Sequence, residues 1–134
     1  MQLTFKFKWA TNQLIVDNLC DDNAERLPQY GWFNRNAGGK THPVGQLRSS
    51  GFGRYDMHGN VWEWCADGHE MEYYATSPKD DPTTGASVGS ERVFRGGCWY
   101  FHAALCRSAY RGGSGPDFRG TNLGFRLAAV LVQQ

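Results

Sequence analysis

One carboxylate, that of Glu63, lies between two tryptophans, Trp62 and Trp64. Side chains alternate between the two faces of an extended segment, so both tryptophans would share one face, with Glu63, Val61 and Cys65 on the other. Burying a carboxylate costs free energy unless the charge is paired. We therefore expect Glu63 to meet an arginine or a cation.

Four cysteines could also carry chemistry, as disulfides, metal ligands or reactive thiols: Cys20, Cys65, Cys98 and Cys106. Their spacing contains no close Cys-x-x-Cys pair of the kind that binds zinc. Free cysteine is among the most buried residue types, so small buried thiols are the simplest interpretation. A disulfide or a reactive thiol stays open as the alternative.

Length, charge and composition describe one domain. A chain of 134 residues can bury a core without disulfides or metals, so we expect a single domain over residues 1–134. The net charge is +1 with acidic and basic residues intermixed, which predicts no nucleic-acid partner. No segment has the length of a membrane span or the pattern of a signal peptide, so we expect a soluble chain of unassigned compartment. Seventeen glycines favour short strands and long loops.

Two strands are predicted at the ends of the chain. Residues 3–9 alternate apolar and polar side chains, as in a half-buried strand. Residues 125–132 are apolar on nearly both faces, which predicts a more central strand. Pairing of these two strands would close the domain. Between them, the acidic start of residues 21–27 suits one or two turns of helix before Pro28.

Loops and glycines mark the middle of the chain. Residues 31–52 are predicted as loop interrupted by aromatic anchors such as Phe33. Residues 70–91 form a polar surface connector whose tyrosine pair at 73–74 would pack back onto the core. Residues 92–99 return to strand, and the glycine pair within them suits a bulge or a close backbone contact.

Four motifs follow one another along the chain: GKTHPVG at residues 39–45, GRYDMHGNVWEW at 53–64, RVFRGGCW at 92–99 and NLGFRL at 122–127. Together they resemble the C-terminal half of the formylglycine-generating enzyme (sulfatase-modifying factor) family. The resemblance implies an α+β domain with the family's irregular C-type-lectin-like fold, in which short strands and long loops surround paired N- and C-terminal strands. The family's usual N-terminal half is missing and residues 1–20 match nothing in it, so we expect a shortened version of the fold.

The resemblance raises the question of oxidase activity. Enzymes of the family bind copper through two cysteine thiolates a few positions apart, just after the Arg-Gly-Gly-Ser-Trp-like motif, and oxidise a substrate cysteine; soft thiolates suit Cu(I). In this chain Cys98 lies inside that motif and Cys106 lies further along, so the pair is not reproduced. We expect no catalytic residue, with Cys98, Cys106 and copper as the enzyme alternative.

A related branch of the family works with a separate iron-binding domain to oxidise thiols, and it would need a cluster of histidines. The four histidines show no paired metal-ligand spacing. We set that branch aside. His58 lies within a motif of the fold, and we interpret it as a structural hydrogen-bonding residue.

For Asn60 and Glu63 the resemblance suggests a structural calcium site, completed by backbone carbonyls of the same loop. Calcium takes oxygen ligands, so the chemistry is suitable. The alternative is a buried ion pair between Glu63 and an arginine, with three candidates: Arg95, Arg107 and Arg126.

Residues 100–122 have an unusual composition. They contain no Lys, Glu, Gln, Met or Trp, although average usage would supply a few. These are the types that an Asn codon cannot reach when the adenines of its first two positions are replaced. Some relatives of this fold are variable proteins of diversity-generating retroelements, in which a reverse transcriptase randomises the adenines of a template rich in Asn codons. The segment is similar to such a product.

That resemblance implies a solvent-facing, ligand-binding segment on a constant frame. The positions expected to vary and to bind the ligand are Tyr100, Phe101, His102, Ala104, Leu105, Tyr110, Gly112, Gly113, Ser114, Gly115, Phe118, Gly120, Thr121 and Asn122. Aromatic side chains among them would supply contact area at low entropic cost. We interpret the chain as a non-catalytic domain that binds a protein or surface ligand. A copper-dependent oxidase and a structural domain without activity are the alternatives.

Overall fold

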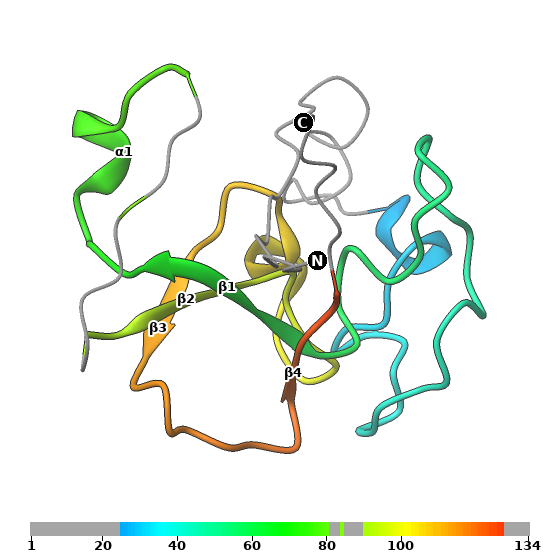
Figure 1. Cartoon of the computed structure of the whole chain (residues 1–134). Helices are drawn as coiled ribbons and strands as arrows, with labels where there is room; N and C mark the ends of the chain where they lie inside the picture. Colours follow the sequence, from blue (N-terminus) through cyan, green and yellow to red (C-terminus); the bar gives the residue numbers. More distant parts are fainter. Residues whose placement is uncertain (1–24, 81–83, 85–89, 128–134) are drawn as a thin grey trace, which may run out of the picture.

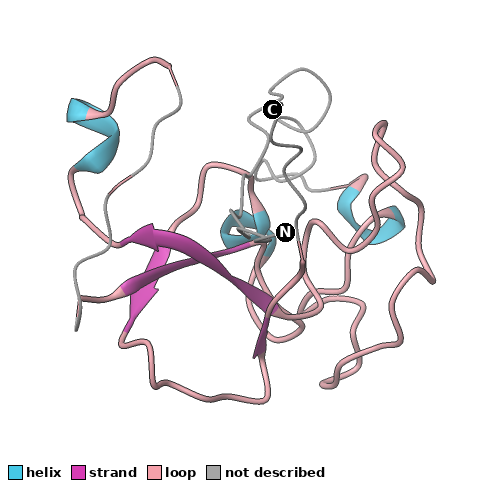
Figure 2. Cartoon of the chain, in the orientation of Figure 1, coloured by secondary structure: helices cyan, strands magenta, loops and turns pink. Residues whose placement is uncertain are grey.

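The computed structural model describes residues 25–80, 84 and 90–127. Its four strands form one mixed sheet in the order β3-β2-β1-β4 (Figure 1). They are β1 (Trp62–Gly68), β2 (Arg92–Arg95), β3 (Gly112–Ser114) and β4 (Leu123–Gly124). A short helix, α1 (Tyr73–Thr76), and two 3-10 helices, Leu27–Gln29 and Ala103–Cys106, complete the regular structure. Most of the remaining described chain is loop and turn (Figure 2), as the glycine content predicts. No helix in these ranges is long and apolar enough to cross a bilayer.

The pairing of β1 explains the architecture. It runs antiparallel to β2, with Trp64 opposite Phe94, and parallel to β4, with Trp62 opposite Leu123. The rings of Trp62 and Trp64 both contact Phe94, at centroid distances of 5.1 and 5.9 Å. The two tryptophans therefore share one face of the sheet, as their alternation with Glu63 predicts. The α+β class is confirmed.

A small core lies under the loops. Leu27, Phe33 and Cys106 are fully buried in contact with one another, with Tyr30 and Ala103 packed against them. Phe33 is the predicted aromatic anchor of the long loop at residues 31–52, which contains no helix or strand. The loop prediction is therefore confirmed for residues 31–52. The buried ring of Phe33 attaches this loop to the core.

The glycine pair after β2 allows a close backbone approach, as predicted. Gly97 has φ of +82°, a region that favours glycine. A Cβ atom at Gly97 would collide with Sγ of Cys106, so the strand end and the second 3-10 helix can touch only because the side chain is absent.

The prediction of a helix over residues 21–27 is wrong for residues 25 and 26, which form a bend. The turn that forms is the 3-10 helix Leu27–Gln29, with Pro28 in its first turn. Proline is tolerated at the start of a helix because its missing N–H would have no partner there. Residues 21–24 lie outside the described ranges.

The predicted C-terminal strand is wrong for its first residues. The chain leaves the sheet after Gly124, where pairing with β1 ends, and Phe125 and Leu127 are 69% and 72% exposed. The rest of that strand, the predicted strand at residues 3–9 and their pairing lie outside the described residues.

Within the connector at residues 70–91, the tyrosine pair contacts arginines. The Arg111 guanidinium lies 4.8 Å from the ring centroid of Tyr73 and 5.3 Å from that of Tyr74. Helix α1 is thereby attached beside the sheet near the end of β1 (Figure 1).

Candidate functional site

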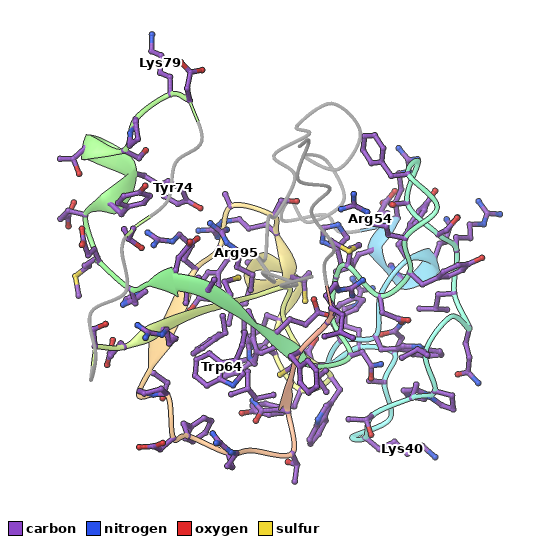
Figure 3. The ribbon with its side chains drawn as sticks, viewed as in Figure 1. Lys40, Arg54, Trp64, Tyr74, Lys79 and Arg95 are labelled. Atoms are coloured by element: carbon purple, nitrogen blue, oxygen red, sulfur yellow. The ribbon has the colours of Figure 1, made fainter. Side chains whose placement is uncertain are left out.

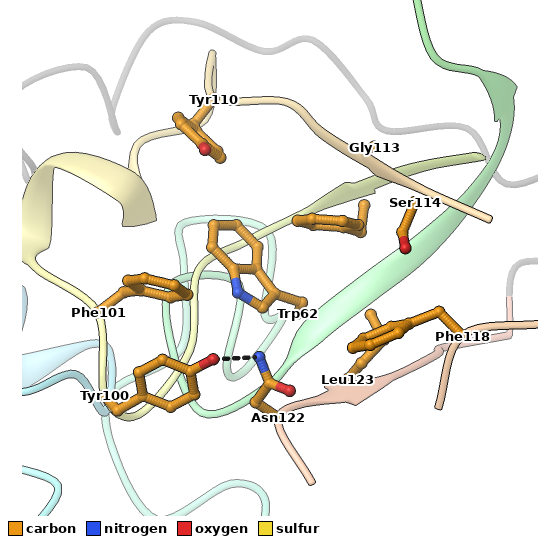
Figure 4. A pocket seen from close by; sticks show the side chains of 10 residues that line it. Trp62, Tyr100, Phe101, Tyr110, Gly113, Ser114, Phe118, Asn122 and Leu123 are labelled. Carbon is orange, nitrogen blue, oxygen red and sulfur yellow. Dashed lines mark hydrogen bonds between the residues drawn. The ribbon is translucent and has the colours of Figure 1, made fainter. Parts of the chain in front are cut away.

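An aromatic hollow of about 240 Å³ lies on the tryptophan face of the sheet (Figure 4). Three of its ten lining residues belong to the sheet: Trp62, Phe94 and Leu123. The other seven come from the segment at residues 100–122: Tyr100, Phe101, Tyr110, Gly113, Ser114, Phe118 and Asn122. All seven are among the positions that the sequence predicts for ligand contact.

Trp62 forms the floor of the hollow. Its side chain is only 3% exposed, and its ring lies 5.4 Å from that of Tyr110 and 5.9 Å from that of Phe101. The indole of Trp62 hydrogen-bonds the Cys98 thiol, so its polar group is already satisfied. A ligand in the hollow would therefore meet the apolar surface of the indole.

The rim carries exposed aromatics and neutral polar groups. Tyr100 and Phe118 are 45% and 47% exposed. Nδ2 of Asn122 donates a hydrogen bond to Oη of Tyr100 at 3.1 Å, drawn in Figure 4. No Lys, Arg, His, Asp or Glu is among the residues that line the hollow. The site therefore suits a neutral, largely apolar group.

The other predicted contact positions lie outside the lining of the hollow. They are His102, Ala104, Gly115, Gly120 and Thr121, all exposed, Leu105, which is half-buried, and Gly112, which is buried. His102 forms a hydrogen bond through Nδ1 with Nδ2 of Asn34 at 2.8 Å. Most of the segment is thus open to solvent, as a binding face requires.

The glycines of β3 are constrained by packing. A Cβ atom at Gly112 would collide with the ring of Phe94, and one at Gly113 would collide with the ring of His69. A Cβ atom at Gly115 would meet nothing within 4 Å. Of these predicted variable positions, only Gly115 has free space around it. Three further residues line the hollow but were not predicted as contact positions, because they lie in motifs interpreted as scaffold: Trp62, Phe94 and Leu123.

The three described cysteines, Cys65, Cys98 and Cys106, are all buried, as the interpretation of the cysteines as small buried residues predicts. Burial raises the pKa of the Cys98 thiol, although hydrogen bonds around the sulfur act in the opposite direction. Cys98 and Cys106 are both fully buried, so neither sulfur is open to an ion from solvent. As arranged here, Cys98 does not suit a Cu(I) site.

Glu63 is paired with Arg126, one of the three arginines expected as alternatives to calcium. Nε of Arg126 donates to Oε2 at 2.6 Å and Nη2 donates to Oε1 at 2.5 Å. The side-chain oxygen of Asn60 accepts from the His42 backbone N–H at 3.0 Å. The side-chain oxygens expected to bind calcium thus accept hydrogen bonds from protein donors in this arrangement. No cluster of three or more His, Cys, Asp or Glu that could hold a metal occurs in the described ranges.

His58 is buried and makes a structural hydrogen bond. Its Nδ1 lies 2.7 Å from the backbone carbonyl oxygen of Cys106. Burial lowers the pKa of His58, with the hydrogen bond to Cys106 opposing that effect. The imidazole joins the motif at residues 53–64 to the second 3-10 helix, in agreement with the structural role expected from the sequence.

The sequence of the chain is similar to parts of several known proteins. The chain is 45% identical to the formylglycine-generating enzyme of Streptomyces coelicolor over 91 residues, which cover 66% of this chain and 29% of the enzyme. It is 40% identical to the serine/threonine-protein kinase Pkn1 of Chlamydia trachomatis over 89 residues, which cover 66% of this chain and 14% of the kinase. The chain therefore spans less than a third of the length of either relative.

Solved structures share the fold. The Treponema denticola variable protein 1 superposes with a TM-score of 0.70 at 41% identity, covering 77% of this chain and 37% of that protein. PvdO from Pseudomonas aeruginosa superposes with a TM-score of 0.69 at 31% identity, covering 83% of this chain and 43% of PvdO. The predicted C-type-lectin-like fold of the formylglycine-generating-enzyme type is confirmed.

The family model for the sulfatase-modifying factor enzyme 1-like domain matches residues 4–131. The expectation that residues 1–20 match nothing in the family is therefore wrong, because the match begins at residue 4. Since the matched residues include both the sheet and the aromatic hollow, this chain belongs to the sulfatase-modifying factor enzyme 1-like family.

Proposed function

We propose that this chain is a non-catalytic binding domain whose segment at residues 100–122 is diversified by a retroelement and contacts a protein or surface ligand. The observation that carries the proposal is which part of the chain supplies the lining of the aromatic hollow. Seven of its ten lining residues belong to the positions that the composition of the segment predicts to vary. The similarity to the Treponema denticola variable protein 1 supports the same interpretation.

The chemistry of the hollow favours one anchoring side chain of a protein ligand. Sites for drug-sized molecules usually enclose about 300–1,000 Å³, more than this hollow offers. Its lining is aromatic and carries no charge, which suits a neutral aromatic or aliphatic group. Protein interfaces often bury such an anchor in a desolvated pocket. The hydroxyl of Tyr100 and the amide of Asn122 stand at the rim for a hydrogen bond.

The genetic part of the proposal is tested in the neighbouring DNA. We expect a near-copy of codons 98–122 with Asn codons at the variable positions, beside a gene for a reverse transcriptase. Isolates would then differ at those positions and agree at frame residues such as Arg107 and Arg111. Neighbouring DNA that lacks both the copy and the reverse transcriptase would refute diversification.

The binding part is tested with side-chain analogues. 4-Methylphenol should shift the NMR signal of the Trp62 indole N–H with a dissociation constant of about 1 mM, or about −4.1 kcal/mol, a plausible affinity for a molecule of this size. n-Butylammonium and propionate serve as charged controls and should leave the signal in place. The variant Tyr100→Asn/Phe118→Asn should weaken the response, because it removes the exposed aromatic rim. An equal response to all three probes would contradict the proposal that the hollow binds a neutral anchoring side chain.

The second candidate is a copper-dependent oxidase of the formylglycine-generating type, which the identity to the enzyme of Streptomyces coelicolor favours. It is tested by Cu(I) titration and by oxygen consumption with a cysteine-containing peptide. Stoichiometric copper binding that is lost in Cys98→Ser and Cys106→Ser would favour this enzyme over the binding domain. A domain without activity, the third candidate, would respond in neither assay.

A further inference from the structure

Arg95, the last residue of β2, reaches the main chain of residues 108–110, which lie shortly before β3. Its Nη1 donates to the carbonyl oxygen of Ser108 at 2.9 Å and to that of Tyr110 at 3.3 Å. Its Nη2 donates to the phenolic oxygen of Tyr74 at 3.0 Å. Figure 3 shows Tyr74 extending from α1 on the side of the sheet where Arg95 lies.

Tyr74 completes the set of contacts. Its hydroxyl donates to the carbonyl oxygen of Ala109 at 2.9 Å. The carbonyl oxygens of three consecutive residues, Ser108, Ala109 and Tyr110, are thus each held by Arg95 or Tyr74. Hydrogen bonds from a charged donor are stronger than neutral ones, so the Arg95 contacts weigh most. All these acceptors belong to the main chain, so the contacts do not depend on which side chains stand there.

Arg111 attaches α1 to the same stretch. Its Nη1 donates to the carbonyl oxygen of Glu70 at 3.2 Å and its Nη2 to that of Gly68 at 3.4 Å. Its guanidinium also lies over the ring of Tyr74. The connector that contains α1 is therefore tied to the residues directly before β3 through both Tyr74 and Arg111.

We propose that Arg95 and Tyr74 are positioning residues for the binding face. They fix the main chain of residues 108–110, which holds the ring of Tyr110 against Trp62 at the floor of the aromatic hollow. The side chains of Ser108 and Ala109 remain exposed, so substitution there leaves the main-chain contacts in place. That these hydrogen bonds serve ligand binding rests on the proposed function. Their effect on the main chain of residues 108–110 can be tested without any ligand.

The test is amide hydrogen exchange on the full chain without ligand. The Tyr110 amide, which donates to the Arg107 carbonyl at 3.0 Å, is the reporter. We expect Arg95→Gln and Tyr74→Phe each to speed its exchange by about tenfold, which corresponds to about 1.4 kcal/mol. Arg95→Lys should give a smaller increase than Arg95→Gln, because the ammonium group keeps a charged donor, although it cannot reproduce the guanidinium geometry.

Two controls separate positioning from general stability. The Trp99 amide, which donates to the Asn60 carbonyl at 2.9 Å, should keep its exchange rate in every variant. Arg54→Gln is the matched substitution, because Arg54 is exposed and none of the described side-chain hydrogen bonds comes from its guanidinium. Equal acceleration at Trp99 and Tyr110, or none at Tyr110, would overturn the proposal. Should Arg95→Gln fail to fold, Tyr74→Phe decides alone, since it removes one surface hydroxyl. Failure of ligand binding leaves this result unaffected.

Discussion

Arg126 holds both carboxylate oxygens of Glu63, with the Nε–Oε2 distance at 2.6 Å and the Nη2–Oε1 distance at 2.5 Å. Nη2 also donates to the carbonyl oxygen of Asp56 at 3.1 Å. The Glu63 side chain is 10% exposed and that of Arg126 34% exposed. One guanidinium therefore joins β1, the chain after β4 and the turn before β1, and it satisfies a charge that β1 would otherwise bury alone.

Replacing the arginine should destabilise the fold. Arg126→Gln leaves the Glu63 carboxylate buried without a counter-charge, so we expect the free energy of unfolding to fall by about 3 kcal/mol. Urea denaturation measures the loss. The double variant Glu63→Gln/Arg126→Gln removes both charges and should recover part of the stability. The single variant Glu63→Gln completes the comparison. If the loss of unfolding free energy in the double variant equals the sum of the losses in the two single variants, the pairing is contradicted.

Calcium, which the family resemblance implies at Asn60 and Glu63, would have to compete with Arg126. An ion bound by the Glu63 carboxylate must displace the guanidinium, so we expect Arg126→Gln to bind calcium more tightly than the native chain. Isothermal titration of EDTA-treated protein measures both affinities. Equal affinities would place any calcium away from Glu63, and heat in neither protein would dispose of the predicted site.

Two glycines of the binding segment should differ sharply in their tolerance of a side chain. Gly112→Ala forces a methyl group into the ring of Phe94, and we expect a loss of about 1–3 kcal/mol, as for other overpacked sites. Gly115→Ala is the matched control, since the space around it is open, and its effect should stay within about 0.5 kcal/mol. Urea denaturation compares them. Equal costs would show that Phe94 yields to the methyl group.

Acid should destabilise the protein through His58. Burial lowers the pKa of this imidazole, so below the ordinary histidine pKa of about 6.5 the unfolded chain binds a proton that the folded chain does not. The free energy of unfolding then falls as the pH falls, by at most about 1.4 kcal/mol per pH unit for this one group. His58→Asn, which can keep an N–H near the Cys106 carbonyl, should show a shallower dependence between pH 6.5 and the folded-state pKa. Parallel curves would exclude this role.

Alkali should destabilise the protein through Cys98. Burial raises the pKa of its thiol, so above about pH 8.5 the unfolded thiol ionises while the folded one keeps its proton. The unfolded chain then binds fewer protons, and the free energy of unfolding falls as the pH rises. The Cys98→Ala variant has no thiol to ionise at this position, so it lacks this contribution to the pH dependence. Urea denaturation at pH 7 and at pH 9.5 should show a larger fall in the native chain than in the variant, and an equal fall would argue for an ordinary thiol.

Several features follow from the sequence alone because they depend on neighbouring residues. Alternation along residues 61–65 fixes the face of each tryptophan, and the cost of burying a charge requires a partner for Glu63. The glycine pair at 96–97 permits the close approach of the chain. The composition of residues 100–122 singles out seven of the ten residues that line the aromatic hollow.

The tertiary structure decided what depends on residues distant in the chain. From the sequence, three arginines were possible partners of Glu63. The path of the chain after β4 selects Arg126, which is 63 positions away from Glu63 in the sequence. Gly112 lost its freedom to vary only when β2 placed Phe94 against it. The parallel pairing of β4 with β1 ends at Gly124, so Phe125 is exposed although it begins a largely apolar run in the sequence. In each case the contact depends on which strands pair in the sheet and in which register. A local sequence pattern does not specify that pairing.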